Sequence, residues 1–154
     1  MEARDKKGFR YIALAFTFTF SLYNAAYADN ETSCRVTRCS VGQTVMTYSM
    51  QSDQAVGCPT MALARYTSYY LGMLSFGTNE KLLQGEAKSK LQSFRDSAGV
   101  DSFEEAMQGC WKVAHRMRVT IVQHPEDLLV AKVAPVSGRP AFWMSYSHLD
   151  AIGK

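Results

Sequence analysis

The sequence lacks the short motifs by which many hydrolases and nucleotide-binding enzymes are identified. It contains no G-x-S-x-G turn for a nucleophilic serine, no H-E-x-x-H pair for a catalytic zinc ion and no glycine-rich phosphate loop. Its three histidines are scattered along the chain. These absences argue against the common forms of serine-hydrolase, metalloprotease and nucleotide-dependent chemistry. We therefore expect no catalytic residues, no metal site and no cofactor.

The chain also has little excess charge and no long apolar run after residue 28. Residues 29–154 carry 13 Lys or Arg side chains against 12 Asp or Glu, because part of the basicity lies in the first 28 residues. A net charge near +1 lacks the basic excess with which nucleic-acid-binding domains contact phosphates. We expect neither a nucleic-acid partner nor a membrane span in residues 29–154.

Residues 1–28 are typical of a secretory signal peptide. A charged start, Glu2 to Arg10, is followed by 13 mostly apolar residues, Tyr11 to Tyr23, and by the cleavage site Ala26-Tyr27-Ala28. A membrane anchor is the alternative, but a spanning helix needs roughly 20 apolar residues. Cleavage after Ala28 leaves 126 residues, the size of one small domain. We expect this domain in the periplasm, or secreted by another route.

Four cysteines in an exported domain of this size predict two disulfides. Of the three pairings that four cysteines allow, we favour Cys34 with Cys39 because they are close in the sequence. Cys58 then pairs with Cys110, and both are expected on helices. A structural zinc site is the alternative, but it needs paired close spacings, and only one such pair is present.

Helical periodicity begins at residue 58, after an irregular arm over residues 29–57 in which a short edge strand near Val45 is an alternative to a loop. Four helices are expected, over residues 59–76, 79–97, 101–121 and 125–133. In the third, apolar side chains recur at steps of three and four from Phe103 to Ile121. The sequence thus predicts a mainly α domain over residues 58–154, a small bundle of about four helices with two disulfides.

Aromatic side chains supply the candidate partner surface. An aromatic tail follows the last expected helix, and it packs either on its own bundle or against a partner. Trp111 and Arg118 are seven residues apart and so share one flank of the third expected helix. The predicted partner-binding residues are Trp111, Arg118, Phe142, Trp143 and Tyr146.

A cluster of potentially catalytic side chains lies near the C-terminus. Ser145, Ser147, His148 and Asp150 fall within one short stretch. Neighbours in the sequence do not by themselves form a triad, whose members converge in space around an oxyanion hole. A small hydrolase that uses Ser147 or His148 is therefore only an alternative to a binding function.

Two segments resemble the Tai-type immunity proteins. The stretch Val122-Gln123-His124-Pro125-Glu126-Asp127-Leu128-Leu129 is similar to the closing helix segment of that family, and Tyr70-Leu71-Gly72 is similar to a motif in its first helix. The resemblance implies a periplasmic helical protein that blocks cell-wall amidases delivered by rival bacteria. The cysteines at 58 and 110 also resemble the pair that joins the helices of small periplasmic acid-stress chaperones.

Together these features predict an exported protein that acts by binding rather than by catalysis. The expected partner is another envelope protein, such as a cell-wall hydrolase that the chain inhibits, and a second copy of the chain is an alternative. An accessory role in a secretion or conjugation machine is the alternative function within the binding class.

Overall fold

The computed structural model describes residues 33–152. The predicted signal peptide, residues 1–28, lies outside the described residues. Within residues 33–152, no helix is both long and apolar enough to cross a membrane.

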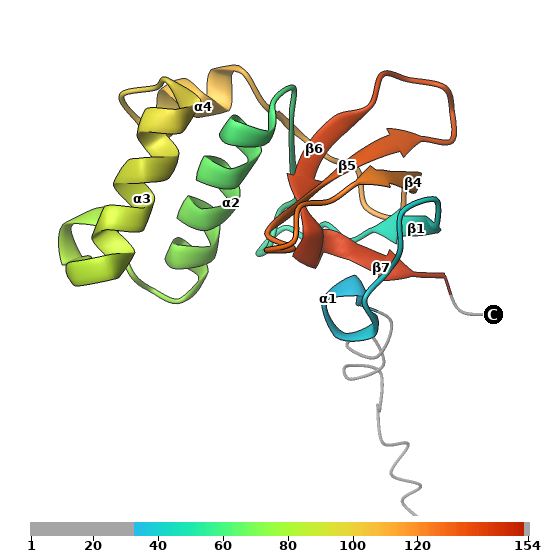
Figure 1. The fold of residues 1–154 in the computed structure, drawn as a ribbon, viewed down its shortest axis with the longest axis horizontal. Helices are drawn as coiled ribbons and strands as arrows, with labels where there is room; N and C mark the ends of the chain where they lie inside the picture. The colour runs from blue at the N-terminus through green and yellow to red at the C-terminus, as the bar shows by residue number, and fades with distance from the viewer. Residues whose placement is uncertain (1–32, 153–154) are drawn as a thin grey trace, which may run out of the picture.

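An antiparallel seven-stranded sheet dominates the fold, in the order β3-β2-β6-β5-β4-β1-β7. Helix α2 lies between this sheet and α3, so the elements form layers (Figure 1). The strands are β1 (Thr44–Thr47), β2 (Val56–Cys58), β3 (Trp111–Lys112), β4 (Arg118–Gln123), β5 (Val130–Pro135), β6 (Phe142–Ser145) and β7 (Leu149–Ala151). The helices are α1 (Cys34–Thr37), α2 (Met61–Ser75), η2 (Glu80–Leu82), α3 (Gly85–Ala98), α4 (Phe103–Gln108) and η3 (Tyr146–His148).

The prediction of a mainly α bundle was wrong, and the third expected helix shows why. Only its start is helical, as α4, which ends at Gln108 with Gly109 as the cap, and β3 and β4 follow it. Val119 and Ile121 are buried while Arg118 is exposed and Thr120 only partly buried, an alternation with the period of two that defines a strand. The four-residue step from Met117 to Ile121 matched a helix by coincidence.

The fourth expected helix and the aromatic tail are also strands. Residues 125–128 form a turn in which Leu128 has a φ of 48°, and β5 begins at Val130. The loop over residues 136–141, which contains Gly138, then joins β5 to β6 as a hairpin. The arm expected to be irregular likewise contributes β1, which pairs with both β4 and β7, and most of β2.

The first two expected helices are present as α2 and α3. Thr60 begins α2, because its side-chain oxygen accepts a hydrogen bond from the Leu63 N–H. Gly99 ends α3 in the left-handed conformation that favours glycine. Their amphipathic spacing was sufficient to find them from the sequence.

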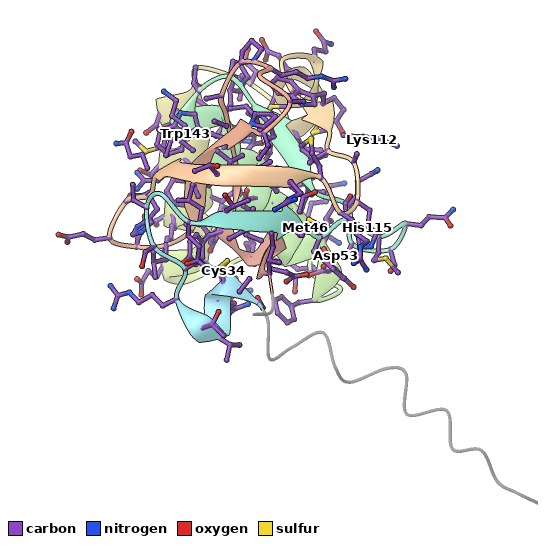
Figure 2. The ribbon with its side chains drawn as sticks, turned by 90° about the vertical axis from the view of Figure 1, so that its right-hand side faces the viewer. Cys34, Met46, Asp53, Lys112, His115 and Trp143 are labelled. Carbon is purple, nitrogen blue, oxygen red and sulfur yellow. A yellow bond between two sulfur atoms is a disulfide. The ribbon has the colours of Figure 1, made fainter. Side chains whose placement is uncertain are left out.

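Residues 59–110, which contain α2, α3 and α4, form a helical insertion between two paired strands. Gly57 of β2 lies opposite Trp111 of β3, so both ends of the insertion meet at the sheet. The rest of the chain has a core of its own, formed by one face of the strands and closed by α1 (Cys34, Cys39, Val45, Ala55, Val113, Val119, Ile121, Ala131, Val133, Phe142, Met144, Tyr146 and Leu149). Seen from the sheet side, β1 lies in front and the helices behind (Figure 2).

The two disulfides join Cys34 to Cys39 and Cys58 to Cys110, the pairs that the spacing favoured. The expectation that Cys58 and Cys110 lie on helices was wrong: Cys58 ends β2, and Cys110 follows α4. The second disulfide therefore closes the base of the helical insertion. Two disulfides indicate an oxidising, extracytoplasmic environment.

The short disulfide loop is fastened to the sheet core. Cys34 and Cys39 are buried, and the Tyr146 hydroxyl donates a hydrogen bond to the Cys39 carbonyl at 2.8 Å. Ser33, just before α1, forms a bridge to Asp150 of β7. The first helix thus covers one edge strand of the sheet, where open pairing groups invite aggregation.

Gly57 permits two aromatic rings to close over β2. A Cβ atom at Gly57 would lie 2.8 Å from Phe142 Cδ2 and 3.0 Å from Trp111 Cε2. We expect Gly57→Ala to lower the free energy of unfolding by about 1–3 kcal/mol, because the rings must shift from their packed positions. Urea unfolding of the variant measures this loss. Gly109→Ala is the control, since its Cβ would make only an ordinary 3.5 Å contact with Leu63; an equal loss in both variants would contradict the packing role of Gly57.

The two disulfides should contribute unequally to stability. Cys58 and Cys110 are 52 residues apart in the sequence, whereas Cys34 and Cys39 are five apart. In the chain-entropy description, replacing Cys58 and Cys110 with alanines should lower the free energy of unfolding by about 4 kcal/mol. Replacing Cys34 and Cys39 should lower it by about 2 kcal/mol. Urea unfolding of the two double variants gives both values. Equal or reversed losses would show that loop length does not determine the contribution.

Candidate functional site

A long groove runs between α2 and the end of β6. It has two adjoining parts, of about 650 Å³ and 360 Å³. Six residues line both parts, and we call the whole the α2 groove (Arg35, Ser68, Gly72, Phe76, Ser145 and Ser147). The volume of each part falls in the range of about 300–1,000 Å³ that is usual for ligand pockets.

One side of α2 forms the wall of the groove. Ser68, Gly72 and Phe76 follow each other at steps of four residues, which places them on the same side of the helix. A Cβ atom at Gly72 would have nothing within 4 Å. Gly72 therefore leaves the groove open at its middle.

The larger part of the groove is apolar. Its other lining residues include apolar side chains from α2, from the turn before β5 and from the segment after η2 (Tyr69, Met73, Leu83, Leu128 and Leu129). Phe76, at the end of α2, is 84% exposed, the highest value for a large apolar side chain in residues 33–152. An exposed apolar ring that lines a groove is typical of a protein-binding surface.

The smaller part is polar and contains the residues proposed for hydrolysis. His148 Nε2 lies 3.0 Å from Asp53 Oδ1, and the Ser145 and Ser147 hydroxyls lie 2.8 Å apart. His148 Nδ1 is buried without a hydrogen-bond partner. Within residues 33–152 neither serine hydroxyl bonds to His148, so the contact between nucleophile and base that acyl transfer requires is not formed. This structure therefore offers no support for hydrolysis at His148.

Tyr146 lines the groove but stays neutral. Burial raises the pKa of its phenol, although the hydrogen bond to Cys39 and the nearby charge of Arg38 act in the opposite direction. At neutral pH the phenol is thus a structural donor rather than an acid or a base.

The structure divides the predicted partner-binding residues into two groups. Phe142, Trp143 and Tyr146 are buried, so of the two alternatives for the aromatic tail the structure shows packing on its own domain. Trp111 is 45% exposed on β3, and Arg118 is exposed on β4, so they share no helix flank. The sequence did not predict the groove, because residues 59–76 were expected to form one helix of a bundle. An apolar residue next to the helix-ending Gly77 was the available signal.

No protein-family model, curated protein or solved structure matches this chain. Within residues 33–152, no group of three or more His, Cys, Asp or Glu side chains is placed to hold a metal ion.

Gly72 provides a direct test of this geometry. We expect Gly72→Ala to raise the free energy of unfolding by about 0.5–1 kcal/mol, because alanine favours the helix and the methyl group meets no neighbour. The urea unfolding midpoint measures the gain. Gly77→Ala should have the opposite sign, because Gly77 has a φ of 70°. A loss of stability in Gly72→Ala would mean that Gly72 is closely packed after all.

Proposed function

We propose that this protein is exported to the periplasm and acts by binding another envelope protein in the α2 groove. The observation that carries the proposal is the exposed Phe76 ring beside an open apolar groove. Burying such a ring stabilises a complex by about 1.5–3 kcal/mol. Phe76 is therefore the anchor, and the open space over Gly72 accepts a side chain of the partner.

The arrangement favours binding over chemistry. The polar part of the groove has hydrogen-bonding groups but no hydroxyl held against a base. The apolar part is lined by side chains from three separate segments, which are α2, the turn before β5 and the segment after η2. A preformed surface of this kind binds without first having to be ordered, which favours affinity.

The kind of partner follows from the resemblance to immunity proteins. Both segments that carry it contribute to the groove: Gly72 lines its middle, and Asp127, Leu128 and Leu129 line its apolar part. We propose that the partner is a cell-wall hydrolase and that the bound chain inhibits it. The second segment is a turn and the start of a strand rather than a helix, so the proposal concerns the surface and not a shared fold.

The test uses the protein made from its complete coding sequence in its native host, with photoreactive benzoyl-phenylalanine in place of Phe76. We expect a discrete cross-link to one envelope protein. The purified partner should digest isolated cell wall, and added chain should stop the clearing of turbidity. Gly72→Trp should abolish this inhibition by filling the groove, while Gly72→Ala should keep it.

Val41 is the matched control for the cross-link, since it is also exposed but lines neither part of the groove. Equal cross-linking from Val41, or full inhibition by a folded Gly72→Trp variant, would exclude the α2 groove as the surface. Cross-linking to a membrane assembly without inhibition would point to the accessory role instead and refute the inhibitor.

A further inference from the structure

A second groove lies at the opposite end of β6. It has a volume of about 520 Å³. Phe142, the first residue of β6, lines this groove, whereas Ser145, the last residue of β6, lines the α2 groove. Three prolines, Pro59, Pro135 and Pro140, contribute to the walls of the second groove. Proline has a fixed φ and no N–H, so these walls are rigid and present few donors. We call it the Trp111 groove.

Every charged side chain that lines this groove is basic, namely Lys112 and Arg139. Neither of these two basic residues takes part in the ion pairs found within residues 33–152. Their charge is thus available to a ligand.

The acidic residues lie elsewhere. Residues 59–110 carry five Lys or Arg against six Asp or Glu, whereas residues 33–58 and 111–152 together carry seven against four. Within residues 111–149 the only acids are Glu126 and Asp127, and Asp127 pairs with Arg65 of α2 at 2.8 Å. Because its only charged lining side chains are Lys112 and Arg139, the Trp111 groove has a local positive field on a nearly neutral chain.

Trp111 provides an apolar anchor inside that field. It is 45% exposed and packs edge-on against Phe142, with ring centroids 5.4 Å apart, over the space left by Gly57. Tryptophan and arginine are the residues most enriched where binding energy concentrates at interfaces. Lys112 lies at the margin of the molecule, away from Trp143 (Figure 2).

From this combination we infer that the Trp111 groove binds an acidic segment of a partner protein. An apolar side chain of the segment packs on Trp111, and its carboxylates face Lys112 and Arg139. Two basic residues at one groove do not make the extended basic stripe that a nucleic-acid backbone requires. The inference stands apart from the proposed inhibitor function, because the two grooves lie at opposite ends of β6.

The test uses the intrinsic fluorescence of the protein made from its complete coding sequence. The chain has two tryptophans, and only Trp111 is exposed, since Trp143 is buried. The probe is a nine-residue peptide of eight glutamates around a central leucine. We expect a saturable blue shift of the emission, which weakens as salt screens the charges. The same peptide with glutamine in place of glutamate should give no shift.

Charge reversal then separates specific recognition from general attraction. The double variant Lys112→Glu with Arg139→Glu should bind the peptide about tenfold more weakly, as expected for two exposed charge contacts. Lys88→Glu together with Lys90→Glu makes the same change of net charge on α3 and should leave the affinity within about twofold. Calorimetry with Trp111→Ala, whose fold is checked by circular dichroism, should also show weaker binding.

Three results would overturn the inference. They are equal binding of the glutamine peptide, unchanged affinity in the double variant at Lys112 and Arg139, and a shift with phosphatidylglycerol vesicles but not with the peptide. The last result would assign the groove to a membrane surface. None of them bears on inhibition through the α2 groove, which its own variants test.

Discussion

The link between Cys58 and Cys110 determines how the two halves of this molecule are held together. Gly57 and Trp111 are partners in the sheet, so the two cysteines face each other at the point where the helical insertion leaves β2 and returns to β3. Without this closure, the ends of a 52-residue excursion would be joined only by a strand of two residues. The disulfide removes loop entropy from the unfolded chain and fixes the base from which α2 crosses the sheet.

Both grooves follow from this construction. Because α2 begins three residues after Cys58, it crosses the sheet near β6 and leaves the α2 groove beside Ser145 and Ser147. The return strand β3 brings Trp111 next to Phe142 on the other face of the sheet, where Gly57 leaves space for the rings. One β-strand thus separates an apolar groove with an exposed phenylalanine from a basic groove with an exposed tryptophan. The chemistry of the two surfaces differs, which suits them to different parts of a partner or to different partners.

Local patterns predicted only part of this fold. The helices α2 and α3 were found from the spacing of their apolar side chains, a signal that lies within each helix. The segment from Phe103 to Ile121 was misread because its apolar residues keep a helical spacing past Gly109, although the helix ends there. The strand pattern of Val119 and Ile121 is short, and short apolar runs fit a helix or a strand equally well. The aromatic tail was misread because residues in a central strand are buried on both faces and therefore show no alternation.

The even number of cysteines, their favoured pairing, the two long helices and the near neutrality of residues 29–154 follow directly from the sequence. Each of these depends on composition or on neighbours within a few turns of helix. It took the folded arrangement to establish that Phe142, Trp143 and Tyr146 are core, that Trp111 and Phe76 are exposed, and that Lys112 and Arg139 line one groove. Strand partners such as β1 and β4 are more than 60 residues apart in the sequence, so no local pattern specifies which of them meet. Burial and surface charge are set by that pairing.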